Sequence, residues 1–313
     1  MAKGPIDLTA GERWFPKESG FEEDLPLYWG DWGVASEVDD LKAVLLRRPG
    51  KEVENFDSQE ARFTSEPLNI EKLREQHDEL AKIYTDRGIK VYYVEEQRDD
   101  RPNAIYCRDL MFMTPEGAIL GRPGMAMRRG EERYVAQALA KIGVPIVKTV
   151  NGDGIFEGAN AMWVDRKTVV LSTSSRTNRS GYDQVEMELR RMGVTEIIHM
   201  QVPYSNIHID GIMNMASNEH IMVFAPQTPY DVCDALKRKG IKILEAPSQV
   251  EVRQNFGINF VAIKPGVVVQ TDNSPQLREV LEKNGIKVIP VDFSEVIKGR
   301  GAVHCVTGFL KRS

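Results

Sequence analysis

The chain has 313 residues, with 41 Lys and Arg against 46 Asp and Glu, and its formal net charge is -5. A hydrophobic share of 42% is enough for a sizeable core, so the composition excludes a disordered chain, and the net charge argues against a general nucleic-acid-binding protein. The sequence contains neither an apolar run of roughly 18 residues nor an apolar signal-peptide core at its start, so we expect a cytoplasmic protein with no membrane partner.

The first residues stand apart from the rest of the chain. They hold three of the four tryptophans, Trp14, Trp29 and Trp32, together with several glycines and prolines. We expect residues 1–40 to form an extension that packs on the remainder, either as a plain surface cover, at a subunit contact or over a cleft. Residues 41–313 are expected to form a single α/β domain.

From residue 41 onward, one pattern recurs five times: a short apolar strand, an amphipathic helix, a glycine and a second strand. The first strands are expected at 41–49, 117–123, 168–175, 220–226 and 266–272. The helices are expected at 71–87, 132–142, 182–192, 229–239 and 274–284. The glycines that follow them, Gly88, Gly143, Gly193, Gly240 and Gly285, are expected to cap the helices in the left-handed conformation. The second strands then cover 89–94, 144–150, 194–200, 241–247 and 286–291.

This repetition predicts an α/β protein made of five similar modules, arranged around an axis with functional groups at strand ends near that axis. An ordinary α/β sheet, in which a helix-ending glycine also precedes each strand, is the alternative. The strands are rich in β-branched residues, as buried strands are.

Metal and cofactor motifs do not occur. The cysteines Cys107, Cys233 and Cys305 are scattered and odd in number, which argues against a disulfide framework and fits a reduced compartment. No C-x-x-C, H-E-x-x-H or phosphate-binding glycine loop is found, so we expect no metal and no organic cofactor.

Two candidate groups for chemistry lie in the second half of the chain. Cys305 follows a glycine-rich turn and His304, and an adjacent cation favours the nucleophilic thiolate. His208 and Asp210 would face the same side of a strand, where the imidazole could move protons and the carboxylate could bind a cation. Each residue by itself is also compatible with ordinary packing.

Two further groups lie in the first half. Glu157 and Asn160 sit in an apolar stretch, where a carboxylate needs a cationic partner or a proton. Asp109 is the last charge before an apolar run, and in an extended segment it would point away from Arg108. Cys107 would share the face of Asp109 and is expected to serve in packing.

A thiol, an imidazole and three carboxylates from different modules point to a planar, cationic substrate with several N–H groups. A guanidinium has that chemistry, because its N–H groups pair with carboxylates in fork geometry. A cysteine protease of the Cys-His-Asn kind would not need this cluster of acids.

The order of these motifs resembles that of the guanidino-group-modifying enzymes, which include arginine deiminases, amidinotransferases and dimethylarginine hydrolases. The motifs are Arg108-Asp109, Glu157-Gly-Ala-Asn160, Ser174-Ser-Arg-Thr-Asn178, His208-Ile-Asp210 and His304-Cys305. The resemblance covers about residues 40–313. It implies the pentein fold, a five-fold pseudo-symmetric α/β propeller, which agrees with the five modules.

The resemblance also implies roles for individual residues. Cys305 resembles the nucleophile and His208 the general acid/base, while Asp109 and Asp210 resemble the carboxylates that hold the guanidinium. Glu157 resembles a third acid that orients the substrate. The positions that resemble contacts to the rest of the substrate are Asn103, Arg128, Arg176 and Arg300, and Asn160 stands where deiminases usually have a guanidinium-binding Asp.

The chain departs from each branch of the resemblance at one or more positions. Dimethylarginine hydrolases usually have an acid where Arg108 stands, amidinotransferases have Asp in place of Glu157, and deiminases carry an inserted helical domain. The resemblance implies hydrolysis of arginine or an arginine-like compound to citrulline and ammonia through a Cys-thiouronium intermediate. Amidino transfer to an amine, hydrolysis of dimethylarginine and the non-enzymatic role of a ribosome-binding factor of the same fold are the alternatives. No nucleic-acid partner is expected, and a homo-oligomer is left open.

Overall fold

The structure is a computed structural model that describes residues 15–54 and 67–313, so Trp14 lies outside the described residues. Longer helices alternate with short helical turns along the chain. The helices are α1 (Phe21–Tyr28), α2 (Ile70–Thr85), α3 (Cys107–Leu110), α4 (Glu131–Ile142), α5 (Arg179–Arg191), α6 (Tyr230–Arg238), α7 (Gln249–Arg253), α8 (Pro275–Lys283), α9 (Ser294–Lys298) and α10 (Val303–Val306).

The strands form five sheets of three strands each within the described residues. The first contains β15 (Gly308–Arg312), β1 (Leu41–Leu46) and β2 (Lys90–Tyr93). The next two contain β3 (Met111–Thr114), β4 (Gly117–Leu120) and β5 (Ile146–Thr149), then β6 (Ala161–Asp165), β7 (Thr168–Thr173) and β8 (Glu196–Gln201). The last two contain β9 (Met213–Ser217), β10 (His220–Val223) and β11 (Lys242–Glu245), then β12 (Val261–Lys264), β13 (Val267–Thr271) and β14 (Lys287–Val291).

All five sheets have the same pairing pattern. The middle strand pairs antiparallel with one neighbour and parallel with the other, as β4 does with β3 and β5. One long helix, α2, α4, α5, α6 or α8, connects the middle strand to its parallel neighbour. The ten strands and five helices expected from the repeat are confirmed. The repeat analysis did not single out the antiparallel strand that begins each module.

The five glycines that end the long helices all have positive φ, from 74° at Gly88 to 86° at Gly193. This confirms the predicted left-handed caps, because an L-amino acid with a Cβ would be strained at such angles. The chain therefore reverses at the same point in every module and enters the parallel strand.

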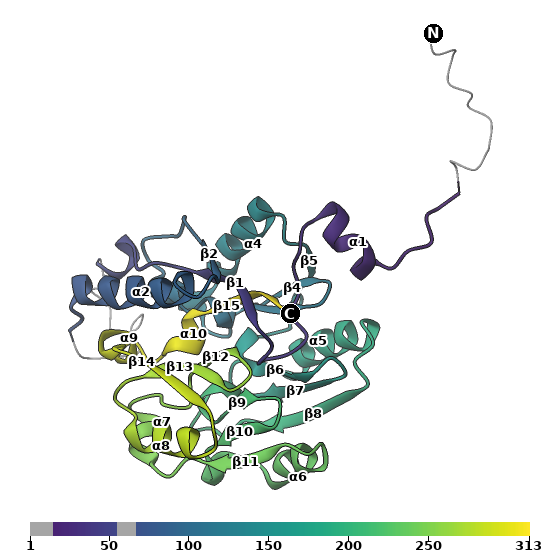
Figure 1. Cartoon of the computed structure of the whole chain (residues 1–313). Helices are drawn as coiled ribbons and strands as arrows, with labels where there is room; N and C mark the ends of the chain where they lie inside the picture. The colour runs from purple at the N-terminus through teal and green to yellow at the C-terminus, as the bar shows by residue number, and fades with distance from the viewer. Residues whose placement is uncertain (1–14, 55–66) are drawn as a thin grey trace.

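The two ends of the repeated region, residues 41–313, meet in one sheet, where β15 pairs antiparallel with β1. In Figure 1 the helices α2, α4, α5, α6 and α8 lie around the outside of the molecule, and the strands lie inside them. Five small sheets thus fit the five predicted modules. Their arrangement as a propeller about one axis remains a prediction.

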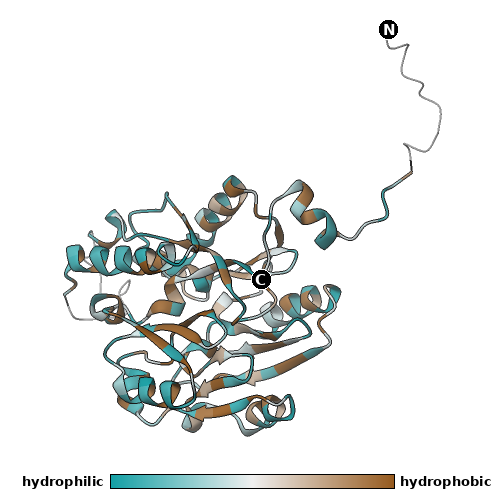
Figure 2. Ribbon diagram, in the orientation of Figure 1, coloured by the Kyte–Doolittle hydropathy of each residue, from teal (hydrophilic) through white to brown (hydrophobic). Residues whose placement is uncertain are grey.

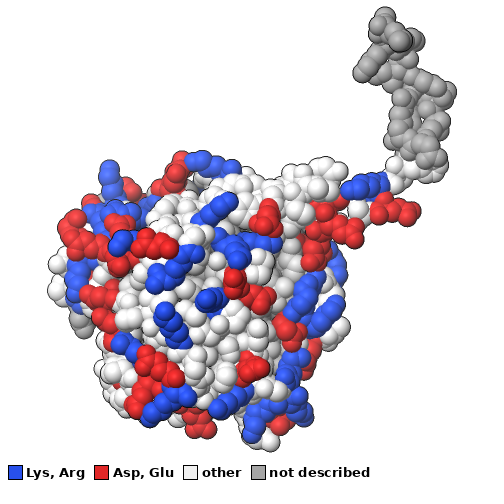
Figure 3. All heavy atoms as spheres, viewed as in Figure 1, with Lys and Arg blue, Asp and Glu red and all other residues white. Residues whose placement is uncertain are grey.

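Burial follows the same division between inner strands and outer helices. Middle strands such as β1, β4 and β10 are almost entirely buried, and Figure 2 shows apolar strands with helices that are polar on one side. Figure 3 shows basic and acidic side chains interspersed over the visible face. In the described part of the chain, we find no helix with the length and apolar character needed to cross a bilayer.

The end of the N-terminal extension joins the body through the backbone. Gly33 donates to the carbonyl of Leu310 in β15, and Val34 donates to the carbonyl of Thr114 in β3. α1 lies at the edge of the molecule (Figure 1) and exposes Tyr28, with Trp29 directly after it, while Leu25 is buried. Residues 33–40 are therefore fixed between two sheets before β1 begins.

Candidate active site

Cys305 lies in the short helix α10, directly before β15, and its thiol is buried. The side-chain amide of Asn259 donates to Sγ at 3.1 Å, and Oδ2 of Asp210 lies 3.7 Å from Sγ. Burial raises the pKa of the Cys305 thiol, and the charges of Asp210 and Asp109 raise it further. The thiol is therefore protonated until a positive charge enters its surroundings.

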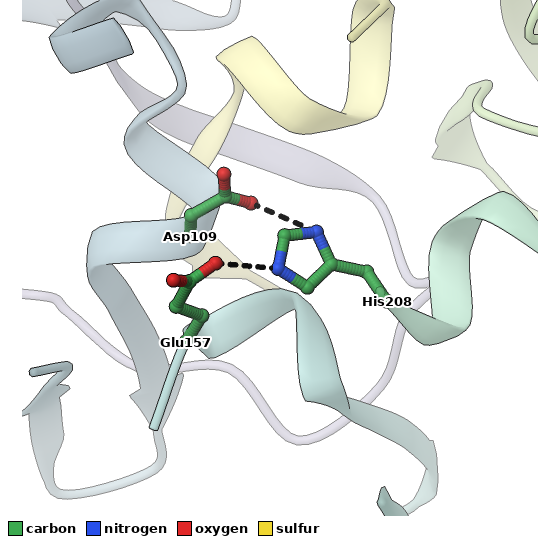
Figure 4. A group of neighbouring side chains, drawn as sticks. All are labelled: Asp109, Glu157 and His208. Carbon is green, nitrogen blue, oxygen red and sulfur yellow. Dashed lines mark hydrogen bonds and ion pairs between the residues drawn. The ribbon is translucent and has the colours of Figure 1, made fainter. Parts of the chain in front are cut away.

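A second group joins His208 to two carboxylates, as Figure 4 shows. Nε2 of His208 lies 2.7 Å from Oε2 of Glu157, and Nδ1 lies 3.6 Å from Oδ1 of Asp109. Burial alone would lower the pKa of His208, but Asp109 and Glu157 outweigh it and raise that pKa. Burial would raise the pKa of Glu157, and the hydrogen bond and charge of His208, with Arg128 and Arg176, lower it to about 2.

Arg128 holds the carboxylates of this group in place. Its guanidinium donates to Oδ2 of Asp109 at 2.6 Å and to Oε2 of Glu131 at 2.9 Å, and Nη1 lies 3.8 Å from Glu157. Burial raises the pKa of Asp109, although the charges of His208 and Arg128 oppose it. Oδ1 of Asp109 is buried and accepts no hydrogen bond from the described residues.

A third group connects Asp210 to the N-terminal segment. His304 has one ring nitrogen 2.8 Å from Oδ2 of Asp210 and the other 2.8 Å from Oε1 of Glu37. Burial would raise the pKa of Asp210, but the hydrogen bond from His304 outweighs it and lowers that pKa. Asp210 is thus ionised beside the thiol.

Five of the polar side chains in and around these groups come from turns that lead into the antiparallel strand of a sheet. Asp109 lies in α3 before β3, Asn160 before β6, Asp210 before β9, Asn259 before β12 and Cys305 before β15. The turn at Glu157 requires close backbone approach, because a Cβ at Gly158 would overlap the carbonyl oxygen of Met111. The modular repeat therefore delivers one polar group per sheet.

The extended conformation expected at two of these places is wrong. Cys107–Leu110 forms a helical turn, and His208 caps the short 3-10 helix Ile209–Gly211. Arg108 and Asp109 still point to different partners, because Arg108 donates to the carbonyls of Gly158 and Ala161. The strands β3 and β9 start only after these turns.

The structure brings Cys305, His208, Glu157, Asp109 and Asp210 into this connected network. Among the expected substrate-binding residues, Arg128 and Arg176 approach Glu157, and the carbonyl of Asn103 accepts from Arg128. Asn160 instead bonds to Ser172 and Ser174. Arg300 is exposed and lines a cleft of about 180 Å³ with Asn206, Ile207 and Phe256, next to the turn that carries His208.

Asp109, Glu157 and His208 offer ligand atoms within 4.8 Å of one another, a spacing that could hold a metal ion. However, Arg128 pairs with Asp109, and His208 already shares its Nε2 with Glu157. These contacts describe a network of mutually compensating charges. A metal ion there would add positive charge beside the Arg128 guanidinium, which is buried next to them.

We did not predict Asn259, Glu37 or Glu131 from the sequence, and we assigned no separate role to His304. Asn259 accepts from the backbone N–H groups of His304 and Cys305 and so fixes the turn that carries the thiol. Its position before β12 matches that of Asp109 and Asp210 before their strands, which is the signal that could have found it. Glu37 lies outside the repeat and had no such signal.

Three comparisons place the chain among known proteins. A model of the family N,N dimethylarginine dimethylhydrolase, eukaryotic, matches residues 48–311. Arginine deiminase 1 of Staphylococcus epidermidis is 21% identical and aligns over 89% of this chain and 98% of its own length.

Solved structures show the same α/β fold. A cysteine-to-serine variant of the dimethylarginine hydrolase of Pseudomonas aeruginosa, complexed with citrulline, has a TM-score of 0.71 and 20% identity, covering 86% of this chain and 99% of its own. The inosamine-phosphate amidinotransferase of Streptomyces griseus has a TM-score of 0.72 and 15% identity, covering 90% and 97%. The fold therefore matches that of the pentein structures.

Proposed function

Because this chain belongs to the N,N-dimethylarginine dimethylhydrolase family of guanidino-group-modifying enzymes, we propose that it hydrolyses the guanidino group of arginine or an arginine-like compound. Water replaces one terminal nitrogen, and the products from arginine are citrulline and ammonia. Cys305 forms the covalent intermediate, and His208 transfers protons.

One observation carries this proposal: the network holds a buried carboxylate oxygen that no N–H of the described residues reaches, and a second carboxylate, already paired with His304, lies beside the thiol. Oδ1 of Asp109 accepts no hydrogen bond from the described residues, and Oδ2 of Asp210 lies 3.7 Å from Sγ of Cys305. A buried acceptor without a partner is costly, typically about 1–3 kcal/mol. The N–H groups of a guanidinium satisfy both carboxylates and bring its central carbon toward the sulfur.

The substrate also ionises its own attacking group. The charges of Asp109 and Asp210 keep the pKa of the Cys305 thiol high. A guanidinium between these carboxylates adds a positive charge and offsets both of them, which favours the thiolate. The reactive form of the enzyme then arises only when substrate is bound.

His208 suits the two proton transfers that follow. After the thiolate adds to the central carbon, His208 gives its proton to one terminal nitrogen, the C–N bond breaks, and ammonia leaves. A thiouronium remains on Cys305. Neutral His208 then takes a proton from water, and the hydroxide adds to the carbon. The C–S bond breaks to release thiolate and citrulline, and the proton of the former hydroxide passes through solvent to ammonia. Glu157 and Asp109 favour the protonated form of His208, which is the form that the first proton transfer requires.

Arginine is the preferred substrate in this proposal because of Asp210. A dimethylated terminal nitrogen has no N–H while it is part of the guanidinium, so a carboxylate facing it would gain no hydrogen bond. Hydrolysis of dimethylarginine remains the second candidate, since the family model that matches residues 48–311 carries that name. Arg108, where that branch usually has an acid, supports arginine.

Amidino transfer shares the first half of this chemistry and differs only in what meets the intermediate. An amine in place of water would complete the transfer. The experiment is to incubate the full chain with arginine alone, with arginine plus glycine or ornithine, and with dimethylarginine. We expect citrulline and ammonia without any acceptor. A new guanidino product only with an amine would indicate a transferase, and dimethylamine only from dimethylarginine would indicate the second candidate.

A chain that releases none of these products would have a binding role, as the ribosome-binding factors of this fold do, and the proposed hydrolysis would be wrong.

We assign recognition of the end of the substrate that lies away from the guanidino group to Arg176, Arg300 and Asn103. Arg128 already donates to Asp109 and Glu131, so it contributes by holding the guanidinium-binding carboxylate. A carboxylate on the substrate would have to compete with Asp109 and Glu131 for the Arg128 guanidinium.

A further inference from the structure

His304 is clamped between two buried carboxylates. Its Nδ1 lies 2.8 Å from Oδ2 of Asp210, and its Nε2 lies 2.8 Å from Oε1 of Glu37. A neutral imidazole has only one N–H, so one of these contacts would set a nitrogen lone pair against an anionic oxygen. Both contacts are hydrogen bonds only if the ring carries two N–H groups and a positive charge.

The surroundings of His304 complete the balance of charge. The second oxygen of Glu37, Oε2, lies 3.9 Å from Nη2 of Arg108 and accepts no hydrogen bond from the described residues. Arg312 of β15 also acts on Glu37 through its charge. Glu37, His304, Asp210 and Arg108 form a buried set with two negative and two positive charges. Phe309 packs its ring edge-on against His304, with 5.4 Å between centroids.

Asp210 is the member of this set that reaches the reaction. The oxygen that accepts from His304 is the one that lies 3.7 Å from Sγ of Cys305. The backbone N–H of His304 donates to Asn259 at 3.0 Å and Nε2 of its ring is held by Glu37, so the ring keeps its place beside Asp210. The ring therefore fixes one rotamer of Asp210.

We propose that His304 and Glu37 are positioning residues, in which Glu37 keeps His304 as an imidazolium and His304 holds Asp210 in the orientation that receives the substrate guanidinium. This inference rests on the proposed function for the identity of the substrate. It gives the N-terminal segment a part in the site, because Glu37 follows the backbone contacts that tie Gly33 and Val34 to β15 and β3.

The charge state of His304 is tested first and without any substrate. The full chain is labelled with ¹⁵N-histidine, and the ring nitrogens of its five histidines are followed between pH 6 and 9. The His304→Gln spectrum identifies the His304 signals. We expect two N–H nitrogens on His304 at pH 7.5, and in Glu37→Gln we expect the second proton to leave at a lower pH. A single N–H in the native chain, or a titration that Glu37→Gln leaves in place, would overturn the clamp.

Positioning of Asp210 is tested by steady-state kinetics of double variants in which Glu37→Gln is always present. Replacing His304 alone would leave the buried Glu37 carboxylate charged and without its partner. His304→Leu removes the donor to Asp210, whereas His304→Gln can restore one N–H. We expect His304→Leu to raise KM for arginine by about tenfold or more, with kcat changing less, and His304→Gln to recover part of that loss. Equal KM values for the two variants would contradict a positioning role.

Glu52→Gln is the matched control, because Glu52 is also buried and paired with an arginine, Arg47, at 2.8 Å. It makes the same chemical change away from the thiol, and it should leave KM for arginine within the error of the native value. If no guanidino compound is turned over at all, the proposed function fails, whereas the NMR result still decides the charge state of His304.

Discussion

Nε2 of His208 lies 2.7 Å from Oε2 of Glu157, and the two residues come from different modules. The other oxygen of Glu157 accepts the backbone N–H of Gly124 at 3.0 Å, so the carboxylate has a fixed orientation toward the ring. The contact with Glu157 raises the proton affinity of His208, the residue that we propose protonates the leaving nitrogen. It therefore offers a direct test of that role.

Glu157→Gln should move the alkaline limb of kcat/KM to lower pH. In the proposed mechanism His208 acts as an acid in the first half-reaction, so activity should be lost as pH rises through its pKa. The glutamine keeps a hydrogen-bond acceptor but removes the negative charge that raises this pKa. A charge-assisted hydrogen bond is worth about 1.5–3 kcal/mol, which corresponds to roughly one to two pH units. The measurement is a pH–rate profile with arginine at low concentration.

Glu251→Gln provides the control for this profile, since Glu251 is buried and its carboxylate accepts from the backbone N–H groups of Gln276 and Leu277. Its profile should overlay that of the native enzyme. If Glu157→Gln lowers the rate but keeps the native alkaline limb, His208 is not the acid that the limb reports.

Cys305→Ser should abolish turnover and preserve binding. The hydroxyl is a far weaker nucleophile than a thiolate, and loss of a covalent nucleophile costs at least about 10³-fold in kcat. Arginine binding, measured by calorimetry, should stay within about threefold, because Asp109 and Asp210 remain. Cys233→Ser on α6 is the control and should retain native kcat. Turnover by Cys305→Ser near the native rate would exclude a covalent role for this sulfur.

Much of the fold follows from the sequence because it depends on local periodicity. Each helix-ending glycine, such as Gly88, needs a left-handed backbone, and the β-branched residues after it form a buried strand. The antiparallel strands were harder to predict. β3, Met111–Thr114, follows its polar turn without a break in the apolar pattern, so no local signal separates the strand from the turn.

Residues of the candidate site could be predicted only where a short sequence motif contains a chemically reactive side chain. Cys305, His208 and Asp210 are reactive types in short, recognisable motifs. Asn259 resembles many structural asparagines and gains meaning from its contacts with the Cys305 turn. Glu37 reaches His304 from 267 residues away in the chain, and such a pairing has no local trace in sequence.

His77 should make the protein less stable in mild acid. It is fully buried in α2, neither ring nitrogen has a hydrogen-bond partner within the described ranges, and burial lowers its pKa to about 4. The unfolded chain binds the proton near pH 6.5, so the free energy of unfolding falls as pH drops from 6.5 toward 4, by up to about 3 kcal/mol. Urea denaturation at pH 7 and pH 4.5 should show a smaller difference in His77→Leu, by about 2–3 kcal/mol.

His199→Leu is the comparison for this measurement, since His199 is exposed on β8. The difference between its free energies of unfolding at pH 7 and pH 4.5 should equal that of the native protein. Carboxylates elsewhere contribute equally to all three proteins and cancel. An unchanged difference in His77→Leu would mean that the ring binds its proton equally well in the folded and the unfolded chain.

Asp210→Asn should weaken the preference for arginine over dimethylarginine. The carboxylate of Asp210 beside Sγ pairs with a terminal nitrogen that bears hydrogen, so its loss should cost arginine at least about tenfold in kcat/KM. Asymmetric dimethylarginine has no N–H on its methylated nitrogen, and it should lose less. The measured quantity is the ratio of kcat/KM for the two compounds. Glu52→Gln is the control, since Glu52 is a buried carboxylate paired with Arg47 outside the site and should leave the ratio at its native value. An equal loss for both substrates in Asp210→Asn would remove Asp210 from the choice between arginine and its dimethylated form.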